Sequence, residues 1–361
     1  MALTLISTGG TIASTRNHDG SVSASLSGEE LLARLPKRIS YRTIGGHLPG
    51  TVGSPEVNDP ASRSVDVSAV QVIDMSVPGS WNLSTELAAS IADTAREAIE
   101  GGSEGVVITH GTDVLEETAW LAELIVGRTT TKGAVVFTAS MRHADEFGGD
   151  GPRNLADALL LAADPRAQGR GSLICLNGEI HHSRWATKQH TTALASFVSP
   201  GRGPVGEMTP VGPVFHTASP SPPPASRIDG EGHTVIGGEV AIVASHWDQN
   251  PGLVPWLVDQ GVAGIVVEGG GAGNINGNLA DGVRGALSAD IPVVVTSRCT
   301  TGSVQPIYGG KGGFATLFAA GAIGSNGLSA GKARLALQIA LGVRPDTISI
   351  AEFFELSDQR A

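Results

Sequence analysis

The run Leu3-Thr4-Leu5-Ile6-Ser7 is followed at once by Thr8-Gly9-Gly10-Thr11-Ile12-Ala13. An apolar, β-prone run that ends in Thr-Gly-Gly-Thr is typical of a buried strand that opens into a tight turn. The two glycines remove side-chain bulk, so a small molecule can approach main-chain N–H groups closely. The hydroxyls of Thr8 and Thr11 flank that gap, as a hydroxyl nucleophile and its oxyanion donors require. By itself, the hexapeptide fits an ordinary strand-to-loop turn equally well.

Length and composition indicate a globular protein of more than one domain. The chain has 361 residues, of which 41% are hydrophobic and 16% are charged. One hydrophobic core rarely supports so long a chain, so two domains are expected. The formal net charge is −11 without a block of lysine or arginine, which disfavours nucleic acid and anionic membranes as partners.

The remaining bulk features favour a soluble cytoplasmic protein. Cys175 and Cys299 lie far apart in the sequence, each in or just after an apolar run, so they are expected to be reduced core residues rather than a disulfide pair. The first apolar run is too short for a signal peptide, and none approaches the roughly twenty residues of a membrane span. The first strand begins almost at residue 1, so no additional N-terminal module is expected.

Short apolar runs alternate with amphipathic stretches, which predicts βαβ units and a mainly parallel sheet. Expected strands after the first are Val106–Thr109, Val135–Thr138, Leu173–Leu176, Val240–Val243, Gly264–Glu268 and Ile291–Val295. Expected helices are Val114–Val126, Pro152–Ala163, Leu253–Asp259 and Leu328–Leu341. The pattern dissolves in a proline-rich stretch, so we expect a catalytic α/β domain at 1–205, a linker at 206–238 and a smaller α/β domain at 239–361.

A second candidate site is His110-Gly111-Thr112-Asp113, between an expected strand and the next helix. Ligands of parallel sheets bind beyond the carboxyl ends of the strands, where Thr11 and Thr112 would both lie. The competing interpretation is structural: Asp113 is a good helix N-cap, and Glu116 would complete a capping box.

Three further features have both a functional and a structural interpretation. Lys188 is a candidate proton-transfer group if it is desolvated, and otherwise a solvated surface lysine. His181, His182 and His190 lack the spacing of a zinc motif, so no metal is expected. The run Gly269–Asn274 resembles a dinucleotide fingerprint but lacks its spacing and its acidic partner, so no nicotinamide cofactor is expected.

Taken together, these segments resemble the bacterial-type L-asparaginase family, in the order in which its motifs occur. The first signature matches Thr8–Ala13 and the second matches His110–Asp113. Further matching stretches are Ala139–Arg142, Asp150–Leu155, Thr187–Thr192, Gly271–Asn274, Thr296–Arg298 and Gly327–Arg334.

The resemblance implies a flavodoxin-like N-terminal α/β domain, a smaller C-terminal α/β domain and a homotetramer built as a dimer of dimers, with sites near the dimer interface. It implies that Thr11 is the nucleophile and that Thr112, Asp113 and Lys188 form a second hydroxyl–carboxylate–amine set. In the same way, it assigns the substrate α-ammonium to Asp113 and the α-carboxylate to Ser80.

For Ser80 two alternatives stay open: Ser76 competes for the carboxylate role, and Ser80 is also placed as a loop or helix-capping serine before the helix near Thr85. Asn274 is a candidate contribution from a partner subunit. The substrate would be a small amino-acid amide, cleaved through an acyl-enzyme without a metal or cofactor.

The chain departs from the family pattern in two places. The expected mobile loop at Ser14–Gly28 has no tyrosine, and no acidic residue follows Thr301-Gly302 as far as Tyr308. Discrimination between asparagine and glutamine therefore stays open.

Glutaminase activity or the amidase part of a tRNA-dependent amidotransferase are alternatives on the same scaffold. An amino-acid or nucleotide sensor that uses the glycine-rich run is an alternative of another class.

Overall fold

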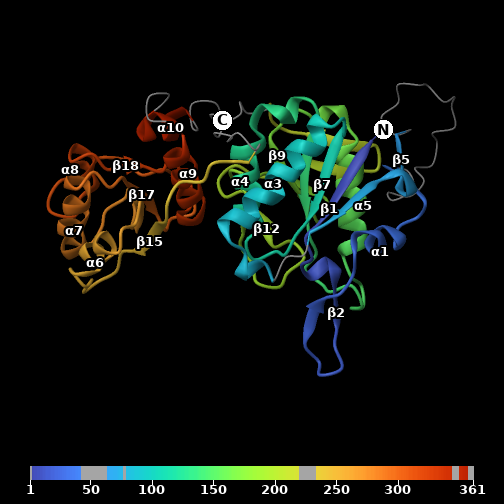
Figure 1. The fold of residues 1–361 in the computed structure, drawn as a ribbon, viewed down its shortest axis with the longest axis horizontal. Coiled ribbons are helices and arrows are strands. Elements are labelled where there is room, and N and C mark those ends of the chain that lie inside the picture. Colours follow the sequence, from blue (N-terminus) through green and yellow to red (C-terminus); the bar gives the residue numbers. More distant parts are fainter. Residues whose placement is uncertain (1, 42–62, 76–78, 219–232, 344–348, 357–361) are drawn as a thin grey trace. The chain divides into compact units, whose positions relative to one another are not determined.

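The structure is a computed structural model that describes residues 2–41, 63–75, 79–218, 233–343 and 349–356. Two compact units divide the chain, Met1–Pro222 and Pro223–Ala361. Both are of the mixed α/β type with a parallel sheet, so the predicted fold class is confirmed (Figure 1).

Five parallel strands form the centre of the first unit, in the order β6-β1-β7-β8-β9. They are Gln71–Asp74, Leu3–Ser7, Gly105–Thr109, Ala134–Thr138 and Ser172–Leu176. This is the 2-1-3-4-5 order of flavodoxin-like sheets, whose topological switch lies between the first and third strands. Here the switch lies between β1 and β7.

The central strands are buried along their whole length except β6, because helices cover both faces of the sheet. These helices are α1 (Gly28–Ala33), α3 (Thr85–Glu100), α4 (Leu115–Val126) and α5 (Gly151–Ala162). Leu3 and Leu5 of β1 share one core cluster with Leu155 and Leu159 of α5. Leucines four residues apart on one face of α5 thus pack in the same core as alternate residues of β1.

Three antiparallel strands extend the sheet beyond β9, namely β10 (Glu179–His182), β13 (Gly206–Thr209) and β14 (Gly212–Phe215). The structure therefore differs from the expected linker at 206–238, since residues 206–215 are a hairpin of the first unit. Pro213 lies in β14, which is the last strand of the sheet, where a missing N–H costs little. Residues 219–232, which hold the run of prolines, lie outside the described part of the chain.

Small two-stranded sheets complete the first unit. They are β2 (Ser14–Arg16) with β3 (Val22–Ala24), β4 (Arg38–Ser40) with β5 (Ser64–Asp66), and β11 (Thr187–Lys188) with β12 (Phe197–Val198). The β2–β3 hairpin projects from the body of the unit (Figure 1).

The second unit has a four-stranded parallel sheet in the order β15-β16-β17-β18. Its strands are Val240–Ala244, Gly264–Gly269, Val293–Ser297 and Ile323–Gly324. Its helices are α6 (Leu253–Asp259), α7 (Gly277–Ser288), α8 (Phe314–Ala319), α9 (Ala330–Gly342) and α10 (Ile350–Leu356). The predicted alternation of strands and helices is present here as well.

Candidate active site

The loops that follow β1 and β7 lie against each other at the carboxyl edge of the sheet. A Cβ atom added to Gly10 would lie 2.4 Å from the backbone nitrogen of Gly111, so the two backbones touch. Gly10 has a φ of 82°, in the left-handed region that favours glycine. Thr11 and Thr112 are the residues that directly follow these glycines. Both threonines therefore lie at the topological switch, where ligands of such sheets bind.

The structure separates the roles of the two threonines in the first loop. Thr8 is only 2% exposed, and its hydroxyl donates to the Thr109 carbonyl at 2.7 Å. The Thr8 N–H donates to the same carbonyl at 3.2 Å. Thr8 thus ties β1 to β7, and its hydroxyl does not flank an open gap as expected. Thr11 begins a short 3-10 helix, Thr11–Ala13, and is half-buried.

His110 fixes the backbone just before Thr112. Its ring is fully buried, and Nδ1 lies 2.7 Å from the Gly111 carbonyl oxygen. Because that oxygen only accepts, Nδ1 carries the proton. Burial lowers the pKa of His110 to about 4, so the ring is neutral at neutral pH. This hydrogen bond sets the plane of the Gly111–Thr112 peptide and so the direction of the Thr112 N–H.

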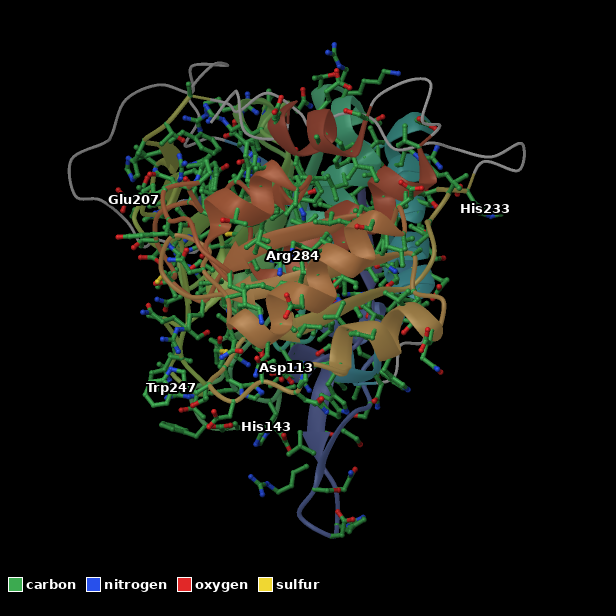
Figure 2. All side chains as sticks on the ribbon, turned by 90° about the vertical axis from the view of Figure 1, so that its left-hand side faces the viewer. Asp113, His143, Glu207, His233, Trp247 and Arg284 are labelled. Carbon is green, nitrogen blue, oxygen red and sulfur yellow. The ribbon has the colours of Figure 1, made fainter. Side chains whose placement is uncertain are left out.

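The side chains of Lys188, Thr112 and Asp113 converge at the same edge. Lys188 Nζ donates to Thr112 Oγ1 and to Asp113 Oδ1, both at 2.8 Å. The lysine side chain is 16% exposed, and the Asp113 side chain is 49% exposed. Figure 2 labels Asp113, which follows β7 at this edge. The structure thus brings the Lys188 amine to a hydroxyl and a carboxylate that lie 76 and 75 residues before it in the sequence.

The structure contradicts the capping interpretation of Asp113 and Glu116. Helix α4 begins at Leu115, its N-cap is Val114, and no side chain caps it. The Glu116 carboxylate instead accepts hydrogen bonds from Thr187 and Lys188, which sequence reasoning did not foresee. The only sequence signal at Glu116 was its spacing from Asp113, and that spacing indicated a cap.

Ser80 lies beside the second loop. It is 6% exposed, and a Cβ on Gly111 would meet its Oγ at 2.5 Å. The capping alternative for Ser80 is wrong, because Ser84 caps α3 and accepts from the Leu87 N–H at 3.2 Å. Ser76, the competing serine, lies outside the described residues. The indole of Trp81 is 71% exposed and folds back over Gly79.

The turn after β8 anchors the β2–β3 hairpin, which directly follows Thr11–Ala13. The Ala144 N–H donates to the Ser14 carbonyl at 2.8 Å. The Arg16 N–H donates to both Asp145 carboxylate oxygens, at 3.3 and 3.1 Å. His143, labelled in Figure 2, donates from Nδ1 to Asp145 Oδ1 at 2.6 Å. The hairpin is therefore held by backbone and carboxylate contacts, without a tyrosine.

Asn274 belongs to the second unit, in the turn after β16. The Gly270 and Asn274 backbones are bridged, and the Asn274 side-chain oxygen accepts from the Phe314 N–H at 3.2 Å. The glycine-rich run is thus a tight turn that leads to α7. A partner-subunit role for Asn274 stays a prediction.

The three histidines considered as metal ligands have separate structural partners. His181 Nδ1 contacts Ser199 Oγ at 2.9 Å, and His182 Nδ1 accepts from the Arg184 N–H at 3.2 Å. His190 Nδ1 accepts from two backbone N–H groups of its own turn, those of Thr192 and Ala193. No group of three or more metal-ligating side chains occurs among the described residues.

Comparisons with known proteins match both units. Residues 2–220 match the family model described as asparaginase, N-terminal, and residues 239–354 match the glutaminase/asparaginase C-terminal domain. The chain belongs to the asparaginase family. This membership confirms the resemblance stated from the motifs.

Several relatives of the asparaginase family match over most of their length. A probable L-asparaginase of Deinococcus radiodurans is 38% identical over 263 residues, 72% of this chain and 77% of that protein. A probable periplasmic L-asparaginase of Haemophilus influenzae is 30% identical over 98% of this chain and 92% of its own. The crystal structure of a probable cytoplasmic L-asparaginase from Campylobacter jejuni matches with a TM-score of 0.78 and 26% identity, over 99% of each chain.

Among the described residues, this member of the asparaginase family has no helix that is long and apolar enough to cross a membrane.

Proposed function

We propose that this chain hydrolyses the side-chain amide of L-asparagine to L-aspartate and ammonia. The observation that supports it most directly is the Lys188 ammonium, 2.8 Å from both Thr112 and Asp113 beside the loop of Thr11. The relatives named above as L-asparaginases support the substrate.

Fixed charges select the substrate in this proposal. The exposed carboxylate of Asp113 receives the α-ammonium, and the Ser80 hydroxyl donates to the α-carboxylate. Ser80 and Asp113 flank Gly111 and Thr112, so both ends of one small zwitterion are bound at the same loop. An amino acid satisfies both groups, whereas a simple amide satisfies neither.

Thr11 is the nucleophile of the first half-reaction. Its Oγ forms a bond to the amide carbon, and the negative charge develops on the carbonyl oxygen. Backbone N–H groups of the first loop and of Thr112 stabilise that charge, and such donors contribute about 3–4 kcal/mol each. The C–N bond then breaks and leaves an aspartyl ester on Thr11, which divides one difficult step into two.

Lys188 and Thr112 supply the proton at the leaving nitrogen. The Thr112 hydroxyl donates to the nitrogen, and the Lys188 ammonium replaces that proton on Thr112. The proton that Thr11 loses passes through the Thr112 hydroxyl to the neutral Lys188 amine and restores its ammonium, so in net one proton moves from Thr11 to the leaving ammonia. Water then attacks the ester: its oxygen bonds to the acyl carbon, the ester C–O bond breaks, and its proton passes to the Thr11 oxygen. Free Thr11 and aspartate result, and the new carboxylic acid gives its proton to the released ammonia. Side chains of this chain and water account for every step.

The cellular location and the oligomeric state of the enzyme are also proposed here from the sequence and the relatives. We place the enzyme in the cytoplasm as a homo-oligomer, a dimer of dimers, without a nucleic-acid or membrane partner. Support comes from the net charge of −11, from the free cysteines, and from the cytoplasmic relative of Campylobacter jejuni. Of these cysteines Cys175 is buried as expected, whereas Cys299 is exposed and not part of the core. The Haemophilus influenzae relative is named periplasmic, so cell fractionation is the test.

A coupled ammonia assay tests the proposal on a panel of asparagine, glutamine and simple amides. We expect wild type to release ammonia from asparagine, and Thr11→Ala and Lys188→Met to lose nearly all of that release while they stay folded. Equal turnover of glutamine would shift the substrate to the glutaminase alternative. A folded wild type that releases no ammonia, or a fully active Thr11→Ala, would overturn the proposal.

A further inference from the structure

Lys188 lies on a very short strand, although its ammonium must be placed to within a fraction of an ångström. Strand β11 consists of Thr187 and Lys188 alone and pairs with Val198 and Phe197 of β12. A lysine reaches its partners through a flexible four-carbon stem, so the position of its backbone decides where Nζ lies. Two strand pairs give little rigidity by themselves.

The edge of β11 that faces away from β12 is held by Glu116. The Gln189 N–H donates to the Ser196 carbonyl of the β12 segment at 2.7 Å. Successive N–H groups alternate in an antiparallel pair, so the Lys188 N–H points to the opposite edge. There it donates to Glu116 Oε2.

Both oxygens of the Glu116 carboxylate take part. Oε1 accepts from the Thr187 hydroxyl at 2.9 Å, while Oε2 accepts from the Lys188 N–H. Hydrogen bonds to a charged acceptor are shorter and about twice as strong as neutral ones. The carboxylate thus holds two adjacent residues of β11 at two points, which fixes both the distance and the direction of the strand.

Glu116 is the second residue of α4, and the loop that precedes α4 contains Thr112 and Asp113. The contacts therefore form a closed ring. It runs from Thr112 along the chain to Glu116, across to the Lys188 backbone, and through the Lys188 side chain back to Thr112.

We infer that Glu116 is a positioning residue whose carboxylate sets the Lys188 ammonium against Thr112 and Asp113. The inference rests on the proposed function, because it assigns Glu116 an effect on the step that Lys188 performs. Glu116 itself touches neither substrate nor reacting atoms. A structural role competes with this one, because Glu116 lies in the first turn of α4, where a negative charge stabilises the helix by interaction with the helix dipole.

A double-mutant cycle separates the two roles. Glu116→Ala should lower kcat for asparagine about 10- to 100-fold with little change in KM, because misplacing a catalytic group by about 1 Å costs that much. In a Lys188→Met background, Glu116→Ala should have no further effect on kcat. Glu86→Gln removes a first-turn carboxylate from α3 and is the matched control, expected to leave kcat unchanged.

Two milder variants distinguish a loss of kcat from a folding defect. Glu116→Gln keeps the size of the side chain but faces two donors with one acceptor, so it should lower kcat less than Glu116→Ala. Thr187→Val removes one of the two hydrogen bonds and should have an intermediate effect. The free energy of unfolding is measured for each, so that a loss of kcat in a folded variant can be read directly.

A crystal structure of folded Glu116→Gln or Glu116→Ala supplies the readout that does not depend on activity. We expect Lys188 Nζ to leave hydrogen-bond distance of Thr112. An unmoved Lys188 with wild-type kcat, or additive losses in the cycle, would overturn the inference. A wild type inactive on asparagine would instead overturn the proposed function, and the position of Nζ would still decide the role of Glu116.

Discussion

At the scale of single residues, two serines close to each other in sequence have separate tasks. Ser80 packs buried against Gly111, whereas Ser84 caps α3. The first is proposed to bind the substrate carboxylate, and the second stabilises a helix. This pair makes it possible to distinguish a binding defect from a folding defect.

Ser80→Ala should raise KM for asparagine about 10-fold or more, because a hydrogen bond to a charged group contributes about 1.5–3 kcal/mol. Ser84→Ala should leave KM unchanged and lower the free energy of unfolding by about 1 kcal/mol, as loss of an N-cap does. Steady-state kinetics and urea unfolding of both variants are the measurements. An unchanged KM in Ser80→Ala would remove Ser80 from the site.

Glu123 is a buried acid that the proposed chemistry does not use. Burial raises its pKa from 4.5 to about 7, although the Ser172 N–H and the nearby Arg184 favour the charged form. The unfolded chain ionises this group above about pH 4.5, while the folded chain keeps the proton until about pH 7. Unfolding therefore releases a proton in that window, so stability falls as pH rises from 4.5 to 7.

Glu123→Gln should remove this dependence. The variant should match wild type near pH 4 and exceed its free energy of unfolding above pH 7 by an amount on the order of 3 kcal/mol. Urea unfolding at a series of pH values is the measurement, with the exposed Glu86→Gln as the control. A difference between the proteins that does not vary with pH would contradict the assignment.

At the scale of elements, the closest approach in the site is between two loops. Gly10 and Gly20 have nearly the same φ, 82° and 85°. A Cβ on Gly10 would strike the Gly111 backbone, whereas a Cβ on Gly20 would meet nothing within 4 Å. Both positions thus have a positive φ that would strain an alanine, and Gly10 alone of the two is in contact with the Gly111 backbone.

Gly20→Ala should cost about 1–2 kcal/mol of stability, the strain of a left-handed residue, and leave kcat unchanged. Gly10→Ala should add a loss of kcat of about 100-fold, because it pushes the loops of Thr11 and Thr112 apart. Kinetics and unfolding of both alanine variants test this. Equal kcat values would show that the contact between the loops is unimportant for the reaction.

The elements were predictable from sequence where the local pattern decides them. The runs at β1, β7, β8 and β9 are apolar on both faces, and Pro152 in the first turn of α5 marks a helix start. The contacts at the N-terminus of α4 were not predictable in this way. Glu116 lies three positions after Asp113, and this spacing is compatible both with a helix cap and with hydrogen bonds to a strand far away in the sequence. The partner of Glu116 is 72 residues away, and local spacing contains no information about it.

The edge hairpin at 206–215 was missed for a related reason. Proline is excluded from a central strand but tolerated in the last one, and sequence alone does not say which strand is last. Likewise, Thr8 and Thr11 are equivalent in the motif, and only the pairing of β1 with β7 shows that Thr8 is used for structure.

At the scale of the whole molecule, the second unit exposes large apolar side chains. Trp247 is 92% exposed, and Trp256, Ile307 and Tyr308 are each more than half exposed. Exposed apolar side chains mark an association site where they gather into one contiguous patch. Whether a partner subunit covers these side chains is tested together with the proposed homo-oligomer.

Subunit complementation tests whether Asn274 acts in a partner's site. Thr11→Ala and Asn274→Asp, which keeps the acceptor for the Phe314 N–H, should each be weakly active alone. Unfolded, mixed and refolded together, they should regain activity, because one site of each mixed dimer has both wild-type residues. Light scattering should show a multiple of the chain mass. A fully active monomer, or no recovery from two assembled variants, would contradict the shared site.

The most direct test of the account is to find where the substrate's acyl group is attached during turnover. The enzyme is mixed with asparagine and quenched in acid within one turnover, and its peptides are analysed by mass spectrometry. The account predicts an aspartyl ester on Thr11, reduced in amount in Lys188→Met because acylation is slowed. An aspartyl ester on Thr112 or on any residue other than Thr11 would contradict it.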